Sequence, residues 1–436
     1  MPSATICCSR MPHREACCLP RTTWRHGTSG SVRATKPPCA CSCNDNGRLV
    51  DMRAVRAYAP GRTELAGNHT DHQGGRVIAG AVSCGIQMAV SENGLDCARI
   101  ASAGFASFEV DLRSDVPRES ERLSTAALVR GVVAGLRAHG VRVGGFDVTA
   151  TSTIPSGGGL SSSAAFELAL GTALVELFGA GCLDAADHAD ARAIALARIG
   201  QAAERDYFGK PCGLMDQLAV ALGGMVGIDF ADEDHPGIQR LNFDFAQQGY
   251  ALCLVDTHCD HSRYTHEYAQ VADDMRAVAR HMGASRLAQV EESAFMNRFE
   301  EVRAQLGDLA ALRGLHYYNE MRLVAERARA LRAGDVDAFL RATRASGSSS
   351  AQYLQNVATA DRTGQPAMVA LALADWQLQG GGAVRIHGGG FGGTIQAFVP
   401  LDRVDAFTCA MDEHLGQGSC RVYEVGGKGA HAVFGG

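Results

Sequence analysis

The sequence predicts an α+β fold made of two domains. Segments with strand character and segments with helix character are both present, and they do not form the regular βαβ repeats of a doubly wound sheet. A chain of 436 residues is also long enough for two structural units. We expect a non-native or disordered extension at residues 1–51, a first domain at 52–245 and a second domain at 246–436.

The extension at residues 1–51 differs in composition from the rest of the chain. It shows neither helical nor strand periodicity, and it lacks the apolar core of a secretory signal, so we predict disorder or a translation start near Met52. It holds seven of the 15 cysteines: Cys7, Cys8, Cys17, Cys18, Cys39, Cys41 and Cys43. A metal site at the last three is a less favoured alternative, because their spacing is not that of a zinc knuckle.

Charge and hydropathy narrow the class of partner. The net charge is −6, and residues 1–51 carry seven basic and three acidic side chains, so the remainder carries −10 (−6 − 4). An acidic chain without basic stripes argues against nucleic-acid binding. No apolar run reaches the roughly 20 residues of a membrane span, and the later cysteines are scattered singly. We expect a cytoplasmic protein with small-molecule partners, compatible with a monomer, although the oligomeric state is left open.

The first elements are expected to be strands. Residues 55–59 alternate toward a Pro-Gly turn, and residues 76–90 form a β-rich run without helical periodicity. Residues 146–150 alternate in the same way before a glycine-rich loop. The alanine- and leucine-rich stretch at 164–178 then favours a helix.

The later elements mix helices and short strands. Helical patterns cover 185–206, the segment from 213 to 223, and almost all of 268–331. Strand-like segments are expected at 252–256, 384–386 and 394–399. The boundary between the two domains is placed near residues 240–250.

The glycine- and serine-rich loop after the strand at 146–150 is the strongest candidate for a phosphate site. Glycines let the backbone approach an anion, and the start of the next helix offers unpaired N–H groups. The expected ATP contacts are Gly157, Gly158, Gly159, Leu160, Ser161, Ser162 and Ser163. One serine can cap the helix and another can bind Mg²⁺. A flexible linker is the alternative, but a linker is not expected between a strand and an apolar helix.

A second glycine cluster occupies residues 388–393. It could be mistaken for a dinucleotide-binding fingerprint, but a strand-like segment follows it where that fingerprint needs a helix. We interpret the cluster as a tight hairpin that allows another backbone to approach closely.

Two acidic residues are candidates for the chemistry of phosphoryl transfer, which needs a proton acceptor and a metal ion beside the anion. Asp216 is expected in the first turn of a helix, where the helix dipole favours an ionised carboxylate that can act as a base. Simple helix capping is the alternative for Asp216. Glu204 is expected near a helix end, which is unfavourable for an acid and would be explained by a bound metal.

A polar turn at residues 61–72 is crowded with groups that could bind the hydroxyls of a polyol. A metal site formed by His69, Asp71 and His72, or a solvated loop, are the alternatives.

Taken together, these segments resemble the GHMP kinase superfamily, and within it the galactokinase branch. Four motifs carry the resemblance over about residues 52–400: the galactokinase signature at 61–75, the nucleotide loop at 155–165, the Cys-Gly-x-Met-Asp-Gln segment at 212–217 and the third glycine motif at 388–393. The resemblance implies a two-domain α+β fold with the active site in the interdomain cleft. It also implies MgATP-dependent phosphorylation of the anomeric hydroxyl of galactose.

The resemblance assigns roles to individual residues. Asp216 matches the catalytic base, and Arg62 matches the arginine that keeps this base ionised and steadies phosphate charge. Ser163 and Glu204 match the Mg²⁺ ligands, and the loop from Gly157 to Ser163 matches the contacts to ATP. The residues that match contacts to the sugar are Arg62, Asn68, His69, Asp71, Asp216 and Tyr268.

The sugar-binding run departs from the family pattern at three positions. Asn68 stands where the family has glutamate, and His72 and Gln73 stand where it has tyrosine and asparagine. An uncharged asparagine can donate as well as accept, so the contact with the far end of the sugar can differ. A kinase of this superfamily for another sugar or small alcohol is therefore the first alternative. A non-catalytic sugar sensor is the second, although Glu204, Asp216 and the serine loop are all present.

Overall fold

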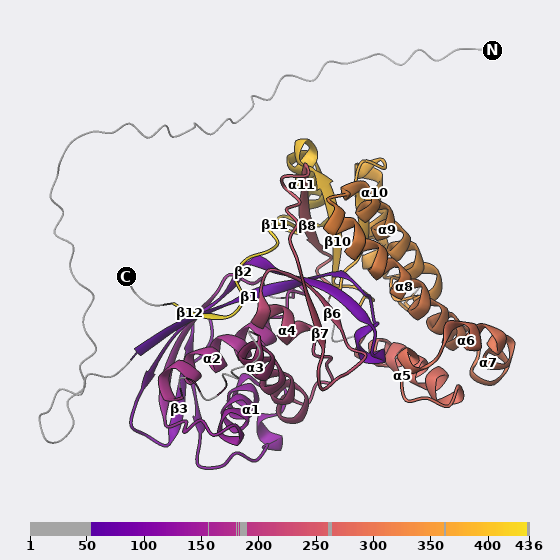
Figure 1. The fold of residues 1–436 in the computed structure, drawn as a ribbon. Coiled ribbons are helices and arrows are strands. Elements are labelled where there is room, and N and C mark those ends of the chain that lie inside the picture. The colour runs from indigo at the N-terminus through magenta and orange to yellow at the C-terminus, as the bar shows by residue number, and fades with distance from the viewer. Residues whose placement is uncertain are drawn as a thin grey trace, which may run out of the picture. The chain divides into compact units, whose positions relative to one another are not determined.

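A computed structural model describes residues 54–433 apart from 156, 180, 182, 184–189, 260–263 and 362. The extension expected at residues 1–51 lies outside the described residues, as does the start of the helix expected at 185–206. Within the described part, helices and strands are mixed in the way that the α+β prediction requires (Figure 1).

The first sheet holds eight of the described strands. They are β1 (Ala54–Ala66), β2 (Arg76–Glu92), β3 (Cys97–Ser102), β4 (Phe108–Asp111), β5 (Phe146–Ser152), β6 (Met225–Asp229), β7 (Gly237–Leu241) and β12 (His431–Val433). The order is β12-β1-β2-β5-β3-β4, with β6 paired to β2 and β7 paired to β6. All pairs are antiparallel except β3 with β5. The strands expected around 55–59, 76–90 and 146–150 are confirmed. The turn expected at Pro60-Gly61 is wrong: β1 continues through these residues to Ala66, with a register shift between Pro60 and Arg62 in place of a turn.

A group of helices covers this sheet below β1 and β2 in Figure 1. The group is α1 (Thr125–Ala138), α2 (Ser162–Phe178), α3 (Ala191–Ala202) and α4 (Met215–Leu222). Helix α2 follows the glycine-rich loop and contacts β1 and β2 as well as the other three helices. This packing buries α2 on nearly every side, which explains why its sequence has no polar stripe. Short turns complete the region: η1 (Asp71–Gln73), η2 (Glu119–Glu121) and the π-helix η3 (Ala203–Phe208).

The second sheet has four antiparallel strands in the order β11-β8-β10-β9. They are β8 (Tyr250–Asp256), β9 (Ala383–Ile386), β10 (Thr394–Pro400) and β11 (Cys420–Tyr423). The helices that accompany this sheet are α9 (Val336–Ser349), α10 (Pro366–Leu378) and α11 (Val404–Leu415), with η6 (Ser350–Leu354) and η7 (Leu401–Arg403) at their ends. Strands β9 and β10 pair as a hairpin around residues 388–393, which confirms the hairpin predicted for the second glycine cluster, but the connection from 387 to 393 is too long for a tight turn. A Cβ atom on Gly390 would overlap with the backbone oxygen of Asn356, so another backbone does approach the cluster closely.

The stretch at 268–331 is helical almost throughout, as expected. The structure has α5 (Thr265–His281), η5 (Leu287–Gln289), α6 (Glu292–Asn297), α7 (Phe299–Leu306) and α8 (Asp308–Ala333). Gly283 and Gly307 adopt φ angles of 82° and 88°, in the left-handed region that ends a helix. Composition does not reveal these breaks, because alanine, arginine and glutamate are abundant on both sides of them.

The end of β1 is held by buried charges from distant parts of the chain. Arg385 on β9 pairs with Glu64, and Arg327 on α8 pairs with Glu320. Both arginines also donate to the carbonyl of Leu65, at 3.4 and 3.1 Å. Removing one partner of such a pair leaves an uncompensated buried charge, so these contacts strongly constrain the position of β1. Strand β1 carries Arg62, and its end leads into the polar turn.

The two-domain division at residues 245 and 246 stays a prediction. The expected boundary falls between β7 and β8, which belong to different sheets. However, β12 returns from the C-terminal part to pair with β1, and the described residues between 54 and 433 pack as one compact unit. The main apolar cluster also contains Leu252, Leu254 and Phe398 of the second sheet. Among the described helices, none combines the length and apolar character needed to cross a membrane.

Candidate active site

Arg62 and Asp216 form a forked ion pair at the centre of the candidate site. Arg62 lies on β1, and Asp216 lies in the first turn of α4, as expected. The Nε and Nη2 atoms of Arg62 donate to the two carboxylate oxygens of Asp216, each at 2.7 Å, and Nη1 donates to the carbonyl of Gly159 at 2.6 Å. The planar guanidinium thus connects the carboxylate to the glycine-rich loop, a geometry that lysine cannot reproduce.

Asp216 is held in its ionised form. Burial by itself would raise the pKa of this carboxyl group, but the charge and hydrogen bonds of Arg62 lower it, and Ser161 and Lys210 act in the same direction. The net pKa lies below the ordinary value for aspartate. The sequence predicted an ionised Asp216 from the helix dipole and, through the family resemblance, from Arg62, and the structure places Arg62 in direct contact with it. An ionised carboxylate that keeps 28% of its side chain exposed can accept a proton from a bound hydroxyl.

The glycine-rich loop reaches the same carboxylate. Ser161 adopts a left-handed conformation, with φ of 56°, and its hydroxyl donates to Asp216. Ser161 occupies the N-cap position of α2 but its side chain makes no capping bond, so the expectation that one of the three serines caps the helix is wrong. Leu160 is buried in the core, and its carbonyl accepts from the Arg62 amide at 3.1 Å. The apolar residue that interrupts the polar loop therefore anchors it beside β1.

Ser163 and Glu204 come together although 41 positions separate them. The Ser163 hydroxyl lies 3.1 Å from Oε1 of Glu204, which is buried at the start of the π-helix η3. Lys210 approaches the same oxygen at 3.0 Å, and Gln217 donates to the other oxygen at 2.8 Å. One carboxylate and one hydroxyl are hard oxygen donors of the kind that Mg²⁺ takes together with phosphate oxygens and water. The residues present therefore fit a shared MgATP site.

Lys210, Gln217 and Glu167 belong to this region but were not singled out from the sequence. Gln217 also donates to Glu167 at 3.2 Å, so one amide nitrogen bridges two buried carboxyl groups. Burial, and next the charge of Glu204, raise the pKa of Glu167 well above its ordinary value. The sequence did hold one indication of Glu167: a glutamate in the middle of an apolar helix is costly to bury unless it is neutral or hydrogen-bonded.

Asn68 lies at the predicted sugar turn but is fully buried. Its amide nitrogen donates to the carbonyl of Gly388 at 2.7 Å, and its amide oxygen accepts from Asn356 at 2.9 Å and from Ser350 at 3.3 Å. A glutamate here could not donate to the Gly388 carbonyl. The contact of Asn68 with a sugar stays a prediction, and it would require the amide to leave these partners.

His69 is also directed toward the third glycine motif. Its Nε2 atom lies 3.1 Å from the Gly389 carbonyl, and its Nδ1 atom lies 3.4 Å from Nε2 of His72. These bonds do not favour the metal-site alternative for His69, Asp71 and His72. Among the residues that the structure describes, no group of three or more His, Cys, Asp or Glu is arranged to hold a metal ion.

Asp71 and Tyr268 complete the set predicted to bind the sugar. Asp71 lies directly against the backbone of Gly213, where a side chain could not fit, so it stands next to the segment that carries Asp216. Burial, and to a smaller extent the charge of Asp216, raise the pKa of Asp71 to about 6. The Tyr268 ring is 43% exposed and lies 5.2 Å from the ring of His69, measured between centroids.

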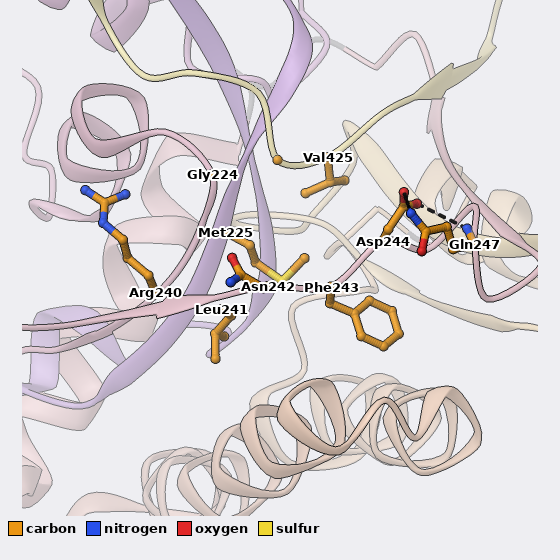
Figure 2. A pocket seen from close by; sticks show the side chains of 10 residues that line it. Gly224, Met225, Arg240, Leu241, Asn242, Phe243, Asp244, Gln247 and Val425 are labelled. Atoms are coloured by element: carbon orange, nitrogen blue, oxygen red, sulfur yellow. Dashed lines mark hydrogen bonds between the residues drawn. The ribbon is translucent and has the colours of Figure 1, made fainter.

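A separate hollow lies away from these residues. It has a volume of about 440 Å³ and includes Met225, Arg240 and Asp244 in its lining. Figure 2 shows Arg240 at one end and Asp244, bonded to Gln247, at the other. Its lining includes none of the residues predicted for catalysis or binding. The side chains of Arg240, Asp244 and Gln247 in this lining already bond to protein groups, so they offer no convergent set for chemistry.

Comparison with known proteins gives consistent matches. A family model for the GHMP kinases N terminal domain matches residues 127–224, and the Galactokinase galactose-binding signature matches residues 51–92. A galactokinase of Streptomyces coelicolor is 33% identical over 84% of this chain and 91% of its own length. A galactokinase of Glaesserella parasuis is 29% identical over 80% of this chain and 86% of its own.

Solved structures show the same fold at lower sequence identity. A Lactococcus lactis galactokinase complexed with galactose superposes with a TM-score of 0.72 at 23% identity, over 87% of this chain and 95% of that chain. A mevalonate kinase of L. major in complex with R-mevalonate gives a TM-score of 0.57 at 16% identity, over 86% and 96%.

Proposed function

The chain belongs to the galactokinase branch of the GHMP kinase superfamily, and on this basis we propose that Asp216 and Arg62 carry out the transfer of the γ-phosphoryl group of ATP to galactose. The chain is an ATP-dependent sugar kinase. One observation carries the assignment of the site: the Asp216 carboxylate, held by both contacts of Arg62, lies directly beside the glycine- and serine-rich loop that precedes helix α2. The product is galactose 1-phosphate.

Each group has a distinct task in the proposed reaction. Asp216 accepts the proton of the anomeric hydroxyl as its oxygen attacks the γ-phosphorus, and the bond from phosphorus to the departing ADP oxygen breaks. Arg62 keeps Asp216 ionised and places a positive charge beside the loop where negative charge accumulates. The N–H groups of the loop from Gly157 to Ser163 hold the phosphates.

Ser163 and Glu204 are the residues that would hold Mg²⁺. When bound with ATP, the ion supplies positive charge to the phosphate oxygens. Lys210 contributes a further positive charge at the same carboxylate.

Replacing Glu204 with Gln is expected to raise the Mg²⁺ concentration needed for half-maximal rate by at least about tenfold, because a charged oxygen donor is lost. Calorimetry of ADP binding with and without Mg²⁺ gives a second measure, since the variant should lose the gain in affinity that Mg²⁺ provides. The exposed Glu119, changed to Gln, is the control. An unchanged Mg²⁺ requirement in Glu204→Gln would contradict the assignment.

The sugar side of the reaction should depend on the ionisation of Asp71. An anionic carboxylate accepts a hydrogen bond from a sugar hydroxyl more strongly than a neutral carboxyl group does. Because the pKa of Asp71 is raised to about 6, kcat/KM for galactose should fall as the pH drops below about 6. Asp216, with its lowered pKa, stays ionised over this range. In Asp71→Asn this acidic limb should disappear; a limb at the same pH in the variant would show that another group causes it.

A panel of sugars tests the substrate. The rate of ADP release should be compared over hexoses, pentoses and small alcohols as kcat/KM. Galactose should be among the best acceptors. A clear preference for another compound would favour the alternative of a different sugar or alcohol, which Asn68 and His72 suggest. ADP release that no compound stimulates would favour a non-catalytic sensor.

A further inference from the structure

His72 and Gln73 replace the tyrosine and asparagine of the family pattern and lie on the short turn η1. We propose that His72 is a positioning residue: together with Gln73 it sets the proton position and orientation of the His69 ring, and through His69 it holds the Gly389 segment against Tyr268. The proposed effect on sugar affinity rests on the function given above. The arrangement of the hydrogen bonds is independent of that function.

The bonds form a chain whose direction is fixed at its first member. The backbone amide of Leu287 can only donate, and it donates to Oε1 of Gln73 at 3.2 Å. This contact places the Nε2 amide group of Gln73 toward His72, where it lies 3.1 Å from Nδ1. An amide nitrogen can only donate, so Nδ1 of His72 must accept. The proton of a neutral His72 ring is therefore on Nε2.

The second half of the chain follows from the first. The Nε2–H group of His72 donates to Nδ1 of His69, so the proton of a neutral His69 is also on Nε2. That proton is directed at the carbonyl of Gly389, which can only accept. The Gly389 carbonyl thus requires the same order of donors and acceptors along the hydrogen bonds as the Leu287 amide imposes at the other end. Every bond is satisfied when both imidazole rings are neutral and protonated on Nε2.

The surroundings favour the neutral rings. Burial is the main cause that lowers the pKa of His72 to about 4 and that of His69 to about 3. Arg276 on α5 opposes a charge on His72, and Arg313 and His316 on α8 oppose a charge on His69. His72 also disfavours the protonation of His69. The acidic neighbour on the same turn is Asp71, which the mechanism already uses.

The chain ends at a tightly packed contact. A Cβ atom on Gly389 would lie 2.5 Å from the Tyr268 ring, so the glycine backbone and this ring touch. The Tyr268 ring also packs against the His69 ring. Asn356 gives the Gly389 carbonyl a second, longer bond at 3.3 Å. If His69 lost its preferred orientation, both the glycine segment and Tyr268 would lose a support, and Tyr268 is one of the residues predicted to face the sugar.

Ring ¹⁵N NMR tests the chain without reference to any substrate. Protein labelled with ¹⁵N-histidine should show His69 and His72 protonated on Nε2, with neither ring titrating between pH 8 and pH 5. In Gln73→Glu the carboxylate should draw a proton to Nδ1 of His72. Either the direction of the hydrogen bonds between His72 and His69 then reverses, or the His72 ring becomes positively charged. A wild-type His69 protonated on Nδ1, or titrating near its ordinary pKa, would overturn the proposal.

Kinetics test the consequence. His72→Phe removes both nitrogens, and we expect KM for galactose to rise by about three- to tenfold, as for the loss of one or two hydrogen bonds, with kcat and KM for ATP changed less than about twofold. In His72→Gln the amide nitrogen can replace Nε2–H, so KM should recover toward the wild-type value. The exposed His414, changed to Phe, is the control. Equal effects of His72→Phe and His72→Gln, or a loss confined to kcat, would overturn the proposal. An active enzyme that prefers another sugar would instead revise the substrate, and the same comparison would then be made with that sugar.

Discussion

Replacing Asp216 with Asn is expected to lower kcat by at least about a hundredfold, because the variant has no carboxylate to accept the proton of the attacking hydroxyl. The change is nearly isosteric, so the phosphate loop should keep its shape and the affinity for ATP should stay close to that of the wild type. Single-turnover kinetics with separate measurement of nucleotide binding would isolate the chemical step.

The chain offers a matched control for Asp216. Asp206 on η3 receives a similar forked contact from Arg205, at 2.7 and 3.0 Å, but this pair lies at the surface. Asp206→Asn should retain nearly full activity, since an exposed ion pair contributes little. If Asp216→Asn kept more than about a tenth of the wild-type kcat, Asp216 would not be the base.

Replacing Arg62 with Lys is expected to lower kcat/KM by about a hundredfold or more. An ammonium group cannot bond both oxygens of Asp216 and the Gly159 carbonyl in one plane, so the base and the loop would lose their common anchor. Arg205→Lys on the surface is the control, and it should have little effect. Equal activity of the Arg62 and Arg205 variants would contradict the role of the fork.

Removing the charge of Arg62 should also change the pH dependence. Arg62 is the main cause that lowers the pKa of Asp216, whereas burial acts in the opposite direction. In Arg62→Met the pKa of Asp216 should therefore rise, and the residual rate should increase with pH over a range where the wild-type rate is flat. In the double variant with Asp216→Asn this pH dependence should be absent. Its persistence would show that a different group titrates.

Much of the fold could be predicted because local patterns carry it. The alternation at 146–150 and the apolar helix at 164–178 each specify their element within a few residues. The alternation at 55–59 indicates the start of β1 but not its continuation through Pro60 and Gly61 to Ala66. The exact breaks after α5 and α7 could not be predicted, because a single glycine ends a helix only when its backbone turns left-handed, and composition does not reveal that. The return of β12 to β1 is a contact between the two ends of the chain, which no local pattern indicates.

The candidate site divides in a similar way. Arg62 and Asp216 are 154 positions apart, and the resemblance to a family named both, but the forked bond between them needed the structure. Lys210 and Glu167 were missed because nothing in their local sequence links them to Glu204. The inward-facing bonds of Asn68 and His69 could not be predicted, because they depend on where the carbonyls of a hairpin more than 300 positions away happen to point.

Phosphorus NMR of the reaction mixture tests the central claim most directly. The wild-type enzyme with MgATP and galactose should produce ADP together with a single sugar phosphate in which phosphorus is coupled to the anomeric proton, which identifies galactose 1-phosphate. Under the same conditions Asp216→Asn should produce it at least about a hundredfold more slowly. Phosphate attached to a different hydroxyl, or ATP consumed at a rate independent of galactose, would contradict the account.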